Sequence, residues 1–113
     1  MGTHEQFVEF RGSSIALDRH GYLTHADDWS EDLAEHLAGL DGVRLGPDHW
    51  RVLRHLRDHH ARHGEPPRMR ALVSAMAPHF GDSGSRTLYR LFPQGPIRQA
   101  CRYAGLPRPD RCI

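Results

Sequence analysis

Lysine and asparagine are absent from the sequence, and only two of its 113 residues are cysteine. All fifteen basic residues are therefore arginine, whose planar guanidinium suits carboxylates and phosphates, and no lysine is available as a nucleophile. No run of about eighteen apolar residues occurs, which excludes a transmembrane helix. The opening stretch, MGTHEQFVEF, has neither a basic region nor an apolar run, so no signal peptide is expected. These absences predict a soluble, cytoplasmic protein that is not inserted in a membrane.

A large charge of one sign is also missing. Fifteen basic and fourteen acidic residues give a formal net charge of +1, short of the balance expected of a dedicated nucleic-acid-binding protein. The length of 113 residues predicts a single domain with one modest core. No Ser-His-Asp order, glycine-rich phosphate loop or paired-carboxylate motif stands out, so a free-standing enzyme is not expected.

The hydrophobic patterns predict an α+β domain. Strand-like runs at residues 7–11 and 13–18, separated by Gly12, indicate a small antiparallel hairpin or meander. Apolar residues at helical spacing then indicate about five helices packed on it, over residues 28–42, 47–64, 69–80, 85–93 and 96–104. The second and third of these resemble a helix-turn-helix pair. We expect a single domain over residues 1–104 and a mobile C-terminal arm over residues 105–113.

Three residues mark the expected helix ends. Asp28, with Glu31 three positions later, forms a capping-box pattern that predicts a helix start. Pro78 is expected to end the third helix early, because proline lacks the amide donor that a helix needs. Gly105 is expected just after the last helix, where a left-handed backbone favours glycine.

Both cysteines lie within the last thirteen residues, CRYAGLPRPDRCI. Two thiols are too few for an all-cysteine zinc site, and in a reducing compartment they favour a redox, catalytic or metal role over a permanent disulfide. Cys101 lies on the apolar stripe of the last predicted helix, near the negative end that raises a thiol pKa, so it is the poorer nucleophile. Its alternative role is that of a small core residue.

Cys112 follows a proline-rich segment in which close packing is not expected. Pro107 and Pro109 restrict the backbone between the two thiols, and eleven extended steps would span on the order of 35 Å. Arg111 favours a thiolate at Cys112 and a terminal carboxylate opposes it, so the sign of their combined effect stays open. We hypothesise that Cys112 carries sulfur and that Cys101 resolves what it brings back. The alternative is that Cys112 is incidental.

Exposed charge offers further candidates. Five arginines form a candidate surface for an acidic partner at the base of the arm, although ordinary solubility is the better explanation for any single one: Arg70, Arg86, Arg90, Arg98 and Arg102. DNA binding through the helix-turn-helix-like pair would use Arg68 and Arg70, but the weak net charge disfavours it. Three histidines share one helix face, and their charged neighbours favour a solvated face over a metal site: His55, His59 and His63.

Several motifs together resemble the DsrC/TusE family of small sulfur-carrier proteins, over residues 7–113. The carrying elements are GYL (21–23), Asp28-Trp29, His49-Trp50, Leu56-Arg57, Pro67 with Arg70 and Leu72, LYRLFPQGP (88–96), and QACRYAGLPRP (99–109) followed by Cys112. The last block is highly specific, whereas single elements such as Asp28-Trp29 carry no weight alone.

The resemblance implies roles for both thiols. A penultimate cysteine is the family's carrier and matches Cys112, while a second cysteine, matching Cys101, marks the DsrC branch. In that branch the arm enters dissimilatory sulfite reductase beside its siroheme, and the two cysteines end bridged by a substrate sulfur as a trisulfide. The TusE branch, a relay for tRNA 2-thiouridine formation, characteristically lacks the second thiol and remains the alternative.

The resemblance also implies partners. These are the catalytic subunits of the reductase, which would hold the siroheme and iron–sulfur cluster, a DsrEFH- or TusBCD-type sulfur donor, and a membrane thiol-oxidoreductase complex of the DsrMKJOP type. No cofactor or metal is expected on this chain, which would be a monomer when free. One departure is Asp110-Arg111, where the family commonly has a small uncharged pair. A charged pair is harder to desolvate in a narrow channel, or it can form a salt bridge with a particular partner.

Overall fold

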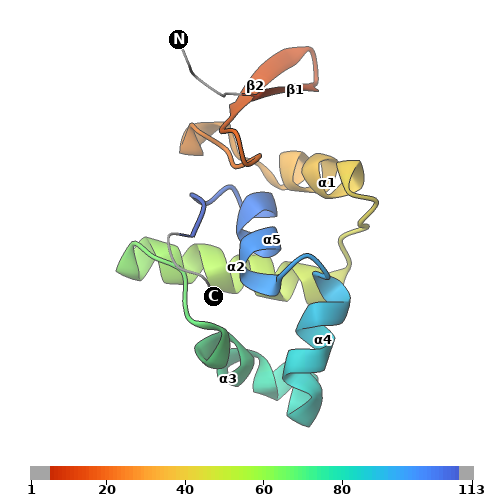
Figure 1. The fold of residues 1–113 in the computed structure, drawn as a ribbon, viewed down its shortest axis with the longest axis vertical. Coiled ribbons are helices and arrows are strands. Elements are labelled where there is room, and N and C mark those ends of the chain that lie inside the picture. The colour runs from red at the N-terminus through yellow and green to blue at the C-terminus, as the bar shows by residue number, and fades with distance from the viewer. Residues whose placement is uncertain (1–5, 110–113) are drawn as a thin grey trace.

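An antiparallel hairpin opens the part of the chain that the structure, a computed structural model, describes, namely residues 6–109 (Figure 1). Strand β1 (Gln6–Phe10) pairs with β2 (Ser13–Leu17), with Phe10 opposite Ser13. The two linking residues, Arg11 and Gly12, both have positive φ, which is typical of the tight turns that match strand twist. Ile15 and Leu17 of β2 are buried, so one face of the hairpin joins the core.

The first helix begins later than the sequence predicts. Residues Ala26–Asp28 form a short 3-10 helix, η1, and Trp29 is extended, so the predicted start at Asp28 is wrong. Helix α1 (Glu31–Leu40) is capped instead by Ser30, whose hydroxyl accepts a hydrogen bond from the Leu33 amide at 3.0 Å. A serine at this position satisfies an amide that has no partner within the helix.

The next two helices are those of the predicted helix-turn-helix-like pair. Helix α2 (Pro47–His63) begins with a proline, as predicted, and ends at Gly64 with φ 73°. Helix α3 (Met69–Phe80) continues past Pro78, so the predicted early end is wrong. The Gly81 amide still donates to the Ala77 carbonyl, which shows that the last turn closes around the proline.

Helix α5 (Pro96–Tyr103) lies at the centre of the helical body. It follows the short 3-10 helix η2 (Gly81–Ser83) and α4 (Gly84–Leu91), and it contacts α1, α2 and α4. In Figure 1 the hairpin lies at one end of the molecule and α3 and α4 lie at the other. The core contains fully buried side chains from each of the five α-helices of the described chain, among them Leu33, Leu53, Leu72, Leu88 and Tyr103. The predicted α+β class is confirmed.

The longest helix, α2, is strongly polar on its outer face. Over residues 6–109, no helix has the length and apolar character needed to cross a membrane.

Candidate functional site

Cys101 is the only one of the two thiols that lies within the described residues. It lies on the buried side of α5 and is 1% exposed. Burial raises the pKa of its thiol to about 12, because no water stabilises a thiolate there. Cys101 is therefore a neutral, enclosed thiol near neutral pH, and its expected place on the apolar stripe is confirmed.

The end of α5 ties this thiol's backbone to the segment that follows. The Leu106 amide donates to the Cys101 carbonyl at 3.1 Å, and the Gly105 amide approaches the Arg102 carbonyl at 3.5 Å. Gly105 has φ 74°, as predicted for the residue just after a helix. These features define a Schellman motif, which fixes the direction in which a chain leaves its helix. Cys101 and the start of the C-terminal segment thus form one local unit.

Two side chains from distant parts of the sequence hold the last carbonyls of α5. The Trp29 indole Nε1 donates to the Tyr103 carbonyl at 2.9 Å, and Arg57 Nη1 donates to the Ala104 carbonyl at 2.7 Å. The Arg57 guanidinium also lies 3.6 Å from the centre of the Trp29 ring. A cation at this position complements the negative end of a helix and interacts favourably with an aromatic face. We call Trp29 and Arg57 the carbonyl clamp.

Gly105 packs against Trp29 of the carbonyl clamp. A Cβ atom at this position would lie 2.3 Å from Cδ1 of Trp29, well inside contact distance. Glycine is therefore required at position 105 both by its left-handed backbone and by the approach of the indole.

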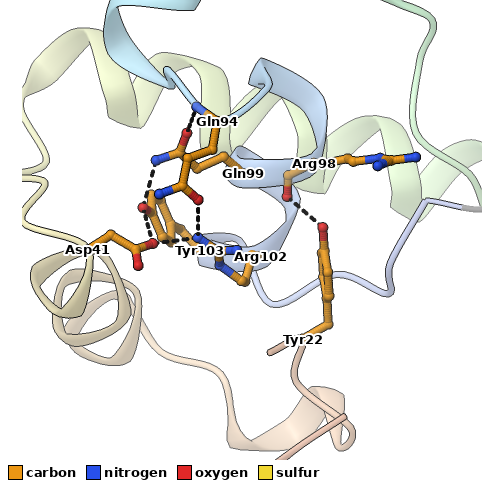
Figure 2. A network of polar contacts seen from close by, with 7 residues as sticks. All are labelled: Tyr22, Asp41, Gln94, Arg98, Gln99, Arg102 and Tyr103. Carbon is orange, nitrogen blue, oxygen red and sulfur yellow. Dashed lines mark hydrogen bonds and ion pairs between the residues drawn. The ribbon is translucent and has the colours of Figure 1, made fainter. Parts of the chain in front are cut away.

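A partly buried polar network joins α5 to the end of α1 (Figure 2). The Tyr103 hydroxyl donates to Asp41 Oδ2 at 2.7 Å and accepts from Gln99 Nε2 at 2.9 Å, and Asp41 also pairs with Arg102. The backbone amide of Gln94 donates to Gln99 Oε1 at 2.7 Å. Burial lowers the pKa of Arg102, but the charge of Asp41 and the hydrogen bonds to Asp41 and Tyr103 together outweigh burial, so that pKa is raised. The network fixes the rotation of α5, and with it the position of Cys101.

The opposite side of α5 faces Tyr22. The Tyr22 hydroxyl donates to the Arg98 carbonyl at 3.1 Å, and burial raises the pKa of Tyr22, partly opposed by the charge of Arg102. The Arg98 side chain points away from the network in Figure 2, and its buried Nε finds no hydrogen-bond partner among the described residues.

The predicted arm begins against the body. Gly105, Leu106 and Pro109 are buried, while Pro107 and Arg108 are exposed. Cys112 and Arg111 lie outside the described residues, as does Asp110, so the predicted meeting of the two thiols and the mobility of the arm stay predictions.

The five predicted docking arginines fall into two groups. Arg98 and Arg102 belong to α5 and are partly buried, and Arg102 is engaged by Asp41. Arg70 lies on α3, and Arg86 and Arg90 lie on α4; all three are exposed. The two groups therefore belong to different regions of the surface, and only the first adjoins the base of the arm.

The histidine face of α2 remains polar. The ring centres of His55 and His59 are 6.2 Å apart, and those of His59 and His63 are 4.5 Å apart. Within the described part of the chain, no group of three histidine, cysteine, aspartate or glutamate side chains is placed to hold a metal ion.

Sequence reasoning did not assign roles to the residues that hold α5. Trp29 and Arg57 appear in the motifs Asp28-Trp29 and Leu56-Arg57, but nothing in those motifs indicates a contact with residues 103 and 104. Asp41 gave no signal, and Tyr22 lies in the motif GYL, which likewise indicates no contact with α5. Their partners lie 62 and 76 positions away in the sequence, and hydrophobic periodicity carries no information about such pairs.

Comparison with known proteins identifies the family. Residues 9–113 match the family described as "DsrC like protein". "Sulfurtransferase TusE" of Escherichia coli (strain K12) is 47% identical over 106 residues, covering 92% of this chain and 97% of that protein. The protein of the same name from Sodalis glossinidius is 44% identical over 108 residues, covering 94% of this chain and all of that protein.

Solved structures agree with this assignment. The oxidized gamma-subunit of the dissimilatory sulfite reductase (DsrC) from Archaeoglobus fulgidus is 35% identical, with a TM-score of 0.85 over 96% of this chain and 100% of that one. Allochromatium vinosum DsrC is 37% identical, with a TM-score of 0.83 over 96% of this chain and 99% of that one. The chain belongs to the DsrC-like family. The predicted family, and its sulfur-relay class, are confirmed.

Proposed function

We propose that this chain is a sulfur-carrier protein in which Cys112 holds sulfane sulfur as a persulfide and Cys101 resolves it. The observation that carries the proposal is the presence of a second thiol, Cys101, on the central helix of a DsrC-like fold. By resemblance, this second thiol is the mark of the DsrC branch. The chain would then act in the cytoplasm as a protein co-substrate, without a cofactor of its own.

The burial of Cys101 supports unequal roles for the two thiols. A thiol whose pKa is raised to about 12 is almost entirely protonated near neutral pH and attacks poorly. Cys112 therefore acts first, and Cys101 reacts only with a sulfur that the C-terminal segment brings to it.

Dissimilatory sulfite reductase is the proposed partner for this exchange. One sulfite, two thiols, two electrons from an external reductant and four protons give one trisulfide and three waters, so the thiols supply the other two electrons. The siroheme and iron–sulfur cluster that reduce sulfite would belong to the reductase. A membrane thiol-oxidoreductase complex of the DsrMKJOP type would supply the four electrons that, with four protons, return the trisulfide to two thiols and release the bridging sulfur as hydrogen sulfide.

A relay for tRNA 2-thiouridine formation is the second candidate. It is favoured by the 47% identity to a protein named sulfurtransferase TusE. In such a relay Cys112 would receive a persulfide sulfur from a TusBCD- or DsrEFH-type donor and pass it on, and Cys101 would have no required step.

An acidic partner surface fits the exposed arginines of α3 and α4. Arg70, Arg86 and Arg90 are exposed, and none of them forms an ion pair within residues 6–109. Charge complementarity at such an exposed surface mainly raises the association rate and selects the partner.

Intact mass measurement separates the two candidates. The protein is incubated with sulfite reductase, sulfite and reductant, next to Cys101→Ala and Cys112→Ala. A gain of one sulfur with loss of two hydrogens, seen only when both thiols are present, supports the reductase co-substrate. An unchanged mass beside an active reductase rejects it and leaves the tRNA relay.

A further inference from the structure

The carbonyl clamp connects three parts of the chain at the point where the C-terminal segment leaves the body. Trp29 follows η1, Arg57 belongs to α2, and the carbonyls that they hold are those of Tyr103 and Ala104. The two donors act on consecutive carbonyls at the end of α5, which have no partner within the helix. The clamp therefore restrains the last turn of α5 from two sides.

This restraint is passed directly to the residues that follow. Gly105 lies against the Trp29 ring in its left-handed conformation, and the Leu106 amide is bonded to the carbonyl of Cys101. The path leaving α5 is thus set by contacts on both sides of the glycine. Without the clamp, the helix end would be free to fray, and the exit direction would vary.

The exit path runs back along the protein. Leu106 is 7% exposed and Pro109 is buried, so the segment turns toward the body after Gly105. Burial raises the pKa of Tyr22, and Arg108 lies near enough for its charge to oppose this rise in part. Tyr22 itself donates a hydrogen bond to α5. In Figure 1 the segment after α5 turns back beside α2, the helix that supplies Arg57.

We propose that Trp29 and Arg57 are positioning residues for the thiol exchange, and that they raise the effective concentration of Cys112 at Cys101. The proposal rests on the proposed function, because it assigns a purpose to the meeting of the two thiols. The clamp holds the backbone carbonyls of Tyr103 and Ala104, and it acts by fixing the start of the connecting segment. Restricting a tether in the productive direction raises the probability that its ends meet.

Glutathione exchange measures this quantity without any sulfur substrate. A Cys112 thiolate attacks glutathione disulfide and expels one glutathione thiolate, which leaves a mixed disulfide. A Cys101 thiolate then attacks the Cys112 sulfur and expels the second glutathione. The ratio of intramolecular disulfide to mixed disulfide at known glutathione concentrations gives the effective concentration.

The chain supplies a matched control pair. Trp50 and Arg54 also form a tryptophan–guanidinium contact, at 5.4 Å, but no hydrogen bond links either of them to α5. The test variants are Trp29→Phe and Arg57→Met, and the controls are Trp50→Phe and Arg54→Met. Arg57→Lys, which keeps a cationic donor, serves as the conservative variant if a larger change prevents folding.

We expect Trp29→Phe and Arg57→Met to lower the effective concentration about tenfold, with a smaller loss in Arg57→Lys. The control pair should stay within about twofold of the unaltered protein. The rate of mixed-disulfide formation at Cys112 should be unchanged in all variants, because the clamp acts on the backbone at residues 103 and 104.

An effective concentration that stays within about twofold in the clamp variants would overturn the proposal, and the clamp would then be a helix cap only. A rise would also overturn it, because the clamp would then hold the thiols apart. Since glutathione replaces the sulfur substrate, the outcome does not depend on sulfur loading. A clamp effect without persulfide loading would reject the proposed function alone.

Discussion

Gly105 and Trp29, seventy-six positions apart, are in direct contact: a Cβ on the glycine would lie 2.3 Å from Cδ1 of the indole. The same indole donates to the carbonyl of Tyr103, two residues before the glycine. Trp29 therefore both packs against and hydrogen-bonds to the same turn of backbone, at residues 103–105. This relationship makes the end of α5 one of the most constrained points of the described chain.

Replacement of Gly105 by alanine should destabilise the protein by about 2–4 kcal/mol, because left-handed strain adds to an overpacked contact. Gly64→Ala is the matched control, since Gly64 has nearly the same φ, 73°, and no atom within 4 Å of its Cβ position. The control should cost about 1 kcal/mol. Urea unfolding measures the loss of stability in both variants. Equal losses would show that the Trp29 ring moves aside for the added methyl group without an energetic cost.

Asp41→Asn should lower the free energy of unfolding by about 1–2 kcal/mol, because a neutral amide weakens the pairing with Arg102 and the bond from the Tyr103 hydroxyl. The matched control is Asp32→Asn, which alters the exposed pair with Arg11. An exposed pair is worth about 0–1 kcal/mol. Thermal or urea unfolding distinguishes the two, and a loss at Asp32 as large as that at Asp41 would contradict the importance of the network.

The buried Cys101 thiol should make stability depend on alkaline pH. Its pKa is about 12 when folded against an ordinary value of 9.0, so the folded protein keeps a proton that the unfolded chain loses. The contribution of the protonated thiol to the free energy of unfolding is complete below pH 9 and falls by about 1.4 kcal/mol for each pH unit above it.

Urea unfolding between pH 8 and pH 10.5 tests this dependence, with Cys101→Ala as the comparison. The pH slope of the unfolding free energy should be shallower in the variant. Identical slopes would show that the thiol is not protected from ionisation. Alkylation of Cys101 in a Cys112→Ser background should also be slow at pH 8.

His49 should make stability depend on acidic pH in the opposite direction. The Gly46 amide donates to Nδ1 at 3.1 Å, and Nε2 lies 3.2 Å from the Leu91 carbonyl, which fits a neutral ring that donates through Nε2. Burial lowers the pKa of His49, although the Leu91 carbonyl partly opposes this. The stabilisation is present above the unfolded pKa of about 6.5 and is lost as the pH falls.

His49→Gln keeps a donor and an acceptor but cannot gain a proton, so it should reduce the loss of stability between pH 7 and pH 5. His63→Gln, at an exposed histidine, is the control for the substitution itself. Chemical unfolding at several pH values provides the measurement. If His49→Gln lost as much stability between pH 7 and pH 5 as the unaltered protein does, the role assigned to this ring would be contradicted.

The sequence predicted those parts of the fold that local residues determine. Gly12, Pro47 and Gly105 each impose or accept a particular backbone conformation, and the predicted turn and helix ends occur there. The apolar stripe of α5 likewise predicted the burial of Cys101. The predicted helix start at Asp28 is wrong because Ser30 caps α1 instead. The predicted early end at Pro78 is wrong because the last turn of α3 closes around the proline.

The contacts that hold the site could not be predicted in this way. Trp29 and Tyr103 are separated by 74 residues, and Arg57 and Ala104 by 47. Neither pair leaves a periodic or local signal, because the acceptors are backbone carbonyls that every residue possesses. The resemblance of Leu56-Arg57 to a family motif marked the arginine without indicating its partner.

Sulfur loading of Cys112 tests the central claim most directly. The unaltered protein, Cys101→Ala and Cys112→Ala are incubated with an inorganic polysulfide, and the extra sulfur is located by mass spectrometry of the C-terminal peptide. We predict one added sulfur on Cys112 in Cys101→Ala and none in Cys112→Ala. Equal loading of Cys112→Ala would contradict the account.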